Sequence, residues 1–296
     1  MLRWWVGSTV LIKDYIALTK PRITWLILMT TGVGYFFGAP KGWPGWHWIT
    51  LIHTIVGTGL IASGTAALNQ WYEREADSKM RRTQARPLPA GRLVAWKALL
   101  FAILISLAGF AELWIGANPL AALLGLFTLL CYLFVYTPLK QRSPHSTTIG
   151  SIPGAMPPLI GFAAASGTLT WDAWVLFAIL FLWQFPHFYA IAWMYKDDYA
   201  RAGIRMLPVV EPDGRSTARR ILLYSIALIP ISLMPKFFAM AGNVYLYGAL
   251  VLGLAFLAAG LRIRSDRTRQ QARVVLLASV VYLPVLFSLM LFDRPA

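Results

Sequence analysis

Three side chains that can offer oxygen ligands recur at intervals of four residues, at Asn69, Glu73 and Asp77. If one helix continues through them, each step turns by only about 40°, so all three side chains lie on one face. Mg²⁺ prefers such hard oxygen ligands and commonly binds through one or two carboxylates together with substrate phosphates. The spacing therefore indicates a magnesium–diphosphate site. An exposed helix end with i,i+4 charge pairs is the alternative explanation of the same spacing.

Basic side chains follow this acidic segment directly. Arg81, Arg82 and Arg86 come shortly after Asp77, and guanidinium groups suit phosphate oxygens because they donate paired hydrogen bonds. An acidic segment followed by a basic one is the arrangement that a magnesium–diphosphate group requires.

A second acidic segment with basic residues behind it occurs at positions 196–205. Asp197 and Asp198 are adjacent, so on a helix their side chains point about 100° apart and only one of them faces a given site. Arg201 and Arg205 follow. If both segments lie on the same side of a membrane, they can close over a single diphosphate.

The elements that must position these residues are membrane-spanning helices. Of the 296 residues, 58% are hydrophobic and only 13% are charged, whereas a soluble domain carries about 25% charged residues. This composition excludes a soluble enzyme, a nucleic-acid-binding domain and a disordered chain. The sequence predicts an all-α polytopic membrane protein with a single domain over residues 1–296.

Nine apolar stretches are each long enough to cross a bilayer. They cover residues 22–39, 48–70, 93–115, 119–138, 148–166, 172–195, 217–235, 243–261 and 273–292. The preceding residues 1–21 are predicted to lie at the membrane surface, with an interfacial helix over Trp4–Ile12. Several prolines and glycines crowd the fifth stretch and predict a kinked helix there.

The net charge of +15 is a topology signal. Of the 27 Lys and Arg residues, 23 fall in the N-terminal segment and in alternate loops between the predicted spans. By the positive-inside rule that side is cytoplasmic, which puts the N-terminus inside and the C-terminus outside a bacterial plasma membrane. The loops over residues 69–92 and 196–216, which carry the two acidic segments, are then both cytoplasmic.

The placement of the ionisable residues also bears on the class of membrane protein. A secondary transporter usually carries charged residues near the membrane midplane, whereas here the acidic clusters lie at helix ends and no inverted repeat is evident. A transporter is therefore the less favoured alternative. Cys131 is the single cysteine, so neither a disulfide framework nor a thiolate metal site is available.

Further motifs connect these segments to a known family. They are Leu18–Arg22, Asn69-x3-Glu73-x3-Asp77, Met80–Leu88, Tyr136–Lys140, Gly154–Gly161, Pro186–Phe188 and Tyr195–Ile204. Together they resemble the UbiA superfamily of intramembrane prenyltransferases and, within it, the branch that acts on haem. The resemblance spans residues 18 to about 208 and implies a helical bundle around a central cavity.

For the reaction, the resemblance implies farnesyl transfer from farnesyl diphosphate to a vinyl group of haem B, with water completing the addition as a hydroxyl group. Mg²⁺ would be held by Asn69, Glu73 and Asp77 with help from Asp197 or Asp198, and we expect Asp198 to be the ligand. The cations implied for the diphosphate are Arg81, Arg82, Arg86, Lys140 and Arg142.

Two departures from the family pattern concern the metal. Glu73 replaces the usual first Asp of the motif and keeps its charge, so it can still bind a metal ion. Many members carry a second Asp-x3-Asp motif, but Tyr195 and Tyr199 occupy those positions here. The number of magnesium ions, one or two, therefore stays open.

Haem B needs a docking site as well as a donor. His187, among aromatic neighbours in the sixth predicted span, either ligates the porphyrin iron or serves as a structural histidine. A quinone precursor or a chlorin is the alternative acceptor within the superfamily. The resemblance also implies that the product, haem O, passes to a downstream haem enzyme or terminal oxidase assembly.

Overall fold

The computed structural model describes residues 11–295, and within that range every regular element is a helix. Eight of its helical segments are long and apolar enough to cross a membrane. The segments are α3 (Trp46–Ser78), α4 (Ala95–Gly116), Pro119–Arg142, Ser146–Ser166, α9 (Trp171–Met194), α12 (Arg215–Phe237), α13 (Asn243–Ser265) and α14 (Arg269–Phe292). The predicted all-α membrane fold is confirmed.

The predicted first span corresponds to α2 (Pro21–Gly38), which has 18 residues and is not among the eight. Because α2 has only 18 residues, Pro21 and Arg22 count within its span, whereas the longer helices contain an 18-residue stretch that is more apolar. Residues 11–18 form a short helix ahead of it. The interfacial helix predicted over Trp4–Ile12 falls almost entirely outside the described residues.

Two predicted spans are built from more than one helix. The fourth consists of α5 (Pro119–Leu130), a π-helical stretch η1 (Cys131–Tyr136) and α6 (Thr137–Arg142). The fifth is broken between α7 (Ser146–Gly154) and α8 (Pro157–Ser166). Because a proline has no N–H to donate and favours the first turn of a helix, Pro157 begins a new helix there. The predicted kink in the fifth span is confirmed.

Helices α2 and α8 pack with their backbones in contact. A Cβ atom built on Gly34 would lie 2.0 Å from the carbonyl oxygen of Pro158, and one on Gly161 would lie 1.9 Å from that of Thr31. Small residues permit this close approach of helices in membranes, where van der Waals contact is a main source of association.

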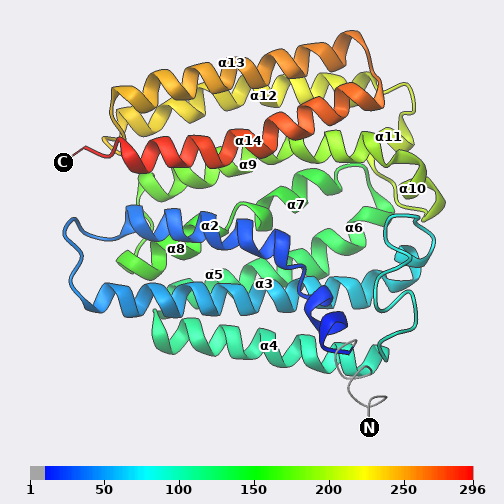
Figure 1. The fold of residues 1–296 in the computed structure, drawn as a ribbon, viewed down its shortest axis with the longest axis horizontal. Helices are drawn as coiled ribbons and strands as arrows, with labels where there is room; N and C mark the ends of the chain where they lie inside the picture. The colour runs from blue at the N-terminus through cyan, green and yellow to red at the C-terminus, as the bar shows by residue number, and fades with distance from the viewer. Residues whose placement is uncertain (1–10, 296) are drawn as a thin grey trace, which may run out of the picture.

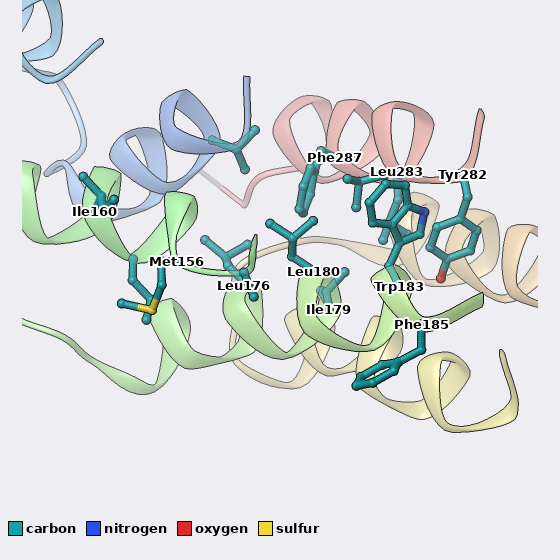
Figure 2. Close-up of a cluster of buried hydrophobic side chains, with 14 of the residues drawn as sticks. Met156, Ile160, Leu176, Ile179, Leu180, Trp183, Phe185, Tyr282, Leu283 and Phe287 are labelled. Atoms are coloured by element: carbon teal, nitrogen blue, oxygen red, sulfur yellow. The ribbon is translucent and has the colours of Figure 1, made fainter. Parts of the chain in front are cut away.

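The core is centred on α9, which lies between α14 and α12 on one side and α7 and α8 on the other (Figure 1). In Figure 2, Leu180 and Trp183 of α9 point toward Leu283 and Phe287 of α14. All four side chains are buried. The Trp183 indole N–H donates to the carbonyl oxygen of Ser279, 2.8 Å away, so the one polar atom of this ring is satisfied.

The acidic segments are brought to one end of the bundle. The connections after α3, α6, α9 and α13 lie at that end, with the short helices α10 (Lys196–Arg201) and α11 (Leu207–Val210), and the C-terminus lies at the other (Figure 1). Helices that alternate in direction produce this arrangement, as the alternating charge of the loops predicts.

Candidate active site at one end of the bundle

A cavity of about 170 Å³ opens among α3, η1, α6, α7 and α9. Its wall combines hard oxygen ligands, cations and aromatic rings. The lining residues are Lys20, Ile23, Asn69, Glu73, Asp77, Met80, Arg82, Arg86, Tyr132, Tyr136, Lys140, Thr147, Phe188, Ile191, Tyr199, Ile204 and Met206.

Asn69, Glu73 and Asp77 share this cavity because α3 continues unbroken to Ser78. Their exposed fractions are 1%, 7% and 1%. The alternative explanation of their spacing, an exposed helix end, is therefore wrong. Buried carboxylates need partners, and these are supplied from other parts of the chain.

Each of the three side chains is matched with one cation from a different segment. The pairs are Lys20 Nζ to Asn69 Oδ1 at 3.0 Å, Lys140 Nζ to Glu73 Oε1 at 3.0 Å, and Arg86 Nη1 to Asp77 Oδ2 at 2.6 Å. All six residues border the same cavity. Positive charge therefore stands beside every oxygen ligand that α3 presents.

Lys20 is a cation that the sequence did not single out as part of the site. It precedes Pro21 in the left-handed backbone conformation, with φ 47°, and this turn directs its side chain to α3. Removal of its ammonium group from water lowers its pKa to about 7, and the positive charge of Arg86 acts in the same direction. The signal in the sequence was a lysine directly before the proline that begins a span.

Asp77 has one carboxylate oxygen with no hydrogen-bond partner. Its Oδ2 pairs with Arg86 and its main-chain carbonyl accepts from Thr83 Oγ1 at 2.8 Å, but Oδ1 is buried without a partner within residues 11–295. The same range holds no group of three His, Cys, Asp or Glu side chains that could bind a metal ion by themselves. An oxygen set of this kind fits Mg²⁺ only if the substrate phosphates complete it.

Of the two adjacent aspartates, Asp198 is buried and Asp197 is exposed, as their helical offset predicts. The Asp198 carboxylate pairs with Arg201 and accepts from the backbone N–H of Arg82 at 3.4 Å. Neither aspartate lines the cavity. Asp198 instead fastens the loop after α3 to α10, and that loop carries Arg82 and Arg86.

Two of the five predicted diphosphate cations do not reach the cavity. Arg81 and Arg142 are both exposed and neither lines it. Arg81 follows the end of α3, where the helical register is lost. Arg142 comes two residues after Lys140 in α6, so its side chain points about 200° away from the one that pairs with Glu73.

Three tyrosines and Thr147 complete the wall, and Thr137 lies behind Asn69. Sequence reasoning did not assign these residues to the site. Thr137 Oγ1 lies 3.3 Å from Asn69 Nδ2, and the Lys140 ammonium lies 4.7 Å from the centre of the Tyr136 ring. Tyr132 and Tyr136 come from η1, and π-helical stretches occur frequently at functional sites. The motif Tyr136–Lys140 was the available signal for this part of the wall.

His187 lies near the cavity but does not line it. Its Nδ1 is 2.8 Å from Ser279 Oγ of α14, and its ring stacks on Trp183 with the ring centroids 4.8 Å apart. The next residue, Phe188, does line the cavity. His187 therefore lies in the contact between α9 and α14.

Comparison with known sequences gives a family match over most of the chain. The model of the UbiA prenyltransferase family matches residues 27–284. A protoheme IX farnesyltransferase of Solibacter usitatus is 65% identical over 96% of this chain and 99% of the relative. One of Koribacter versatilis is 50% identical over 97% of this chain and 95% of the relative.

Solved structures share the fold at much lower identity. Digeranylgeranylglyceryl phosphate synthase is similar with a TM-score of 0.79 at 14% identity, covering 96% of this chain and 98% of the other. A UbiA homolog from Archaeoglobus fulgidus bound to DMAPP and Mg²⁺ has a TM-score of 0.64 at 18% identity, with 94% and 99% covered. The helical bundle is therefore of the UbiA type.

Proposed function

Since this chain belongs to the UbiA prenyltransferase family, we propose that the cavity beside α3 binds farnesyl diphosphate and that the enzyme transfers its farnesyl group to haem B. Its near-full-length relatives are protoheme IX farnesyltransferases, which favours haem over a quinone precursor or a chlorin as the acceptor. In the reaction, C1 of the farnesyl group bonds to a vinyl carbon of haem B and diphosphate leaves with the electrons of the broken C–O bond. Water then adds at the other vinyl carbon and loses a proton, which gives haem O.

The observation that carries the proposal is the pairing of three oxygen-bearing side chains of α3 with three cations around one cavity. Lys20, Arg86 and Lys140 all border this space, so their charge acts on diphosphate oxygens inside it. Fixed cations stabilise a transition state most where negative charge develops, and here that is the departing diphosphate. Arg82, which also lines the cavity, adds a fourth positive charge.

Asn69, Glu73 and Asp77 are the residues that would hold Mg²⁺, and the unpartnered Oδ1 of Asp77 supports this assignment. When bound, Mg²⁺ supplies Lewis-acid stabilisation of the leaving diphosphate. The solved homolog bound to DMAPP and Mg²⁺ is consistent with a role of this kind. Asp198 supports the site by holding the loop of Arg82, and a direct bond from Asp198 to a metal ion is the less favoured role for it.

We further propose that haem B docks on the α9 side of the cavity, beside Phe188. His187, next to Phe188 but turned toward α14, is the candidate axial ligand. The hydrogen bond between its Nδ1 and Ser279 fixes the ring, and metal-binding histidines commonly use one ring nitrogen in this way. Titration of haem B into the wild type and His187→Ala, followed by Soret absorbance, tests the assignment. An unchanged Soret shift and affinity in the variant would reject it.

We infer the direction of the molecule in the membrane from its charge. The acidic segments share an end of the bundle with most of the basic residues, so we propose that the active site faces the cytoplasm of a bacterial cell, with the C-terminus outside. We expect residues 1–296 to act as one domain. The apolar product would then be handed to a downstream haem enzyme or terminal oxidase assembly.

The direct test is an assay of the purified protein with haem B, farnesyl diphosphate and Mg²⁺, followed by mass analysis of the pigment. We expect a product heavier than haem B by one farnesyl group and one hydroxyl group plus released diphosphate, and no product after chelation of divalent ions. Release of diphosphate without a change in the pigment mass would reject haem as the acceptor. Absence of diphosphate release would reject prenyl transfer.

A further inference from the structure

A second hollow lies at the same end of the bundle but on its outer flank, between the start of α12 and the end of α13. Its volume is about 360 Å³, and it shares no lining residue with the active-site cavity. Helices α12 and α13 lie side by side along the edge of the molecule (Figure 1). The lining residues are Arg215, Ala218, Arg219, Leu222, Leu223, Arg264 and Arg267.

The charge of this hollow is strongly positive. All four of its arginines are exposed. Within residues 11–295 the one carboxylate that pairs with any of them is Asp213, at 3.4 Å from Arg215. Asp266 is close in the chain, but its carboxylate accepts from Thr268 Oγ1 at 3.3 Å and does not line the hollow. Arg219, Arg264 and Arg267 therefore retain guanidinium donors for an outside anion.

The deeper wall of the hollow is apolar. Arg215, Arg219 and Leu222 follow one another at intervals of four and three residues, so they form one stripe along α12. Because α12 begins at Arg215, the two leucines lie further into the span than the arginines. Leu223 is 51% exposed although it is a large apolar side chain. The stripe thus runs from cations at the membrane surface to hydrocarbon below.

The positive-inside rule explains why arginines gather at this end of the bundle, but not why four of them converge on one hollow. Arg262 and Arg273 belong to the same end and are exposed, yet neither lines it. Guanidinium groups bind phosphate in a fork of two hydrogen bonds, and basic pockets between membrane helices bind lipid head groups.

We propose that this hollow is a binding site for an anionic phospholipid, with the phosphate held by Arg219 and Arg264 and an acyl chain lying against Leu222 and Leu223. The order of cations and leucines along α12 matches the order of phosphate and hydrocarbon in such a lipid. Inorganic phosphate offers the same anion but has no group for the leucines to contact, so the apolar wall favours the lipid.

The test uses the full-length protein, delipidated in detergent and titrated with phosphatidylglycerol, phosphatidylcholine or glycerol phosphate under native mass spectrometry. We expect one phosphatidylglycerol to bind, and Arg219→Gln/Arg264→Gln to weaken that binding about tenfold or more, as expected for the loss of two interfacial arginines. The matched control Arg262→Gln/Arg273→Gln removes the same charge outside the hollow and should bind like the wild type.

Three results would overturn the proposal. These are equal binding of phosphatidylcholine, equal loss of binding in the control variant, and equal affinity for glycerol phosphate, which would make this a site for free phosphate. Prenyl transfer in detergent shows whether each variant is folded, since none of these four arginines borders the active site. If the double variant is unfolded, Leu223→Asn is used instead, and it should weaken lipid binding without affecting glycerol phosphate.

Discussion

Arg86 binds one oxygen of the Asp77 carboxylate, with Nη1 2.6 Å from Oδ2, and leaves the other oxygen buried and without a partner within residues 11–295. Asp77 is only 1% exposed. A buried polar atom without a hydrogen bond costs about 1–3 kcal/mol. A bound cation that contacts Oδ1 removes that cost. The Asp77–Arg86 pair therefore leaves one carboxylate oxygen ready to bind a cation.

Asp77→Asn should therefore reduce prenyl transfer by about 100-fold or more, a loss of the size seen when one preorganised electrostatic partner is removed. The amide keeps the shape of the side chain but removes the charge that Arg86 and Mg²⁺ both require. The measurement is haem O formation by mass analysis, with membrane insertion checked in parallel. Glu75→Gln is the matched control, because Glu75 is an exposed carboxylate on the same helix. Undiminished turnover in Asp77→Asn would contradict the metal assignment.

The helical period was enough to predict the face shared by Asn69, Glu73 and Asp77, because i,i+4 geometry is local to one helix. The same local geometry predicted that only one of Asp197 and Asp198 is turned inward. Of the three cation partners, Arg86 and Lys140 were predicted as cations of the site, whereas Lys20 was not. Lys20 lies 49 residues from Asn69, and no local pattern encodes that contact.

Lys140 reaches the cavity and Arg142 does not because two positions along α6 turn a side chain by about 200°. The same offset indicates that only one of the two faces a given cavity, but both are basic, so the sequence did not show which one. The π-helical stretch over Cys131–Tyr136 changes the rotation of α6 about the axis of the span, and this rotation directs Lys140 to the cavity. A sequence pattern based on 3.6 residues per turn does not include the rotation that a π-helical stretch adds.

Lys140→Met and Arg142→Gln should consequently behave differently. Lys140→Met leaves Glu73 buried without its 3.0 Å partner, and breaking a buried ion pair in this way costs about 3–5 kcal/mol. We expect a lower unfolding temperature and at least a tenfold rise in the KM for farnesyl diphosphate. The KM of Arg142→Gln for farnesyl diphosphate should stay within about twofold of the wild-type value, since exposed charges contribute little. Steady-state kinetics at saturating haem B measures the KM of each variant, and thermal unfolding in detergent measures its stability. Equal effects of the two substitutions would contradict the observed orientation of α6.

The two adjacent aspartates also make a matched pair. Asp198→Asn weakens the pairing with Arg201 and the hydrogen bond from the Arg82 backbone N–H, so the loop after α3 should loosen. Limited proteolysis should then cleave residues 79–94 faster than in the wild type, with a higher KM for farnesyl diphosphate. Asp197→Asn changes an exposed side chain and should alter neither. Rapid cleavage in both variants would show that the loop is not held by Asp198.

The contact between α2 and α8 can be tested with two glycines on one helix. A Cβ atom on Gly34 would meet the backbone of Pro158 at 2.0 Å, whereas one on Gly32 would meet nothing within 4 Å. Because backbone cannot rotate aside, Gly34→Ala must push α2 away from α8, and overpacking of this kind costs about 1–3 kcal/mol or more. Lys20 directly precedes α2, so its bond to Asn69 should weaken as well.

Gly34→Ala should therefore lower both the unfolding temperature in detergent and the rate of haem O formation. Gly32→Ala should leave the rate unchanged and the unfolding temperature equal or slightly higher, because alanine is favoured over glycine in a helix by about 1 kcal/mol. A loss of activity in Gly34→Ala without a loss of thermal stability would mean that the contact positions Lys20 rather than holding the bundle together. If the two variants were equally stable and equally active, the close packing of α2 on α8 would be contradicted.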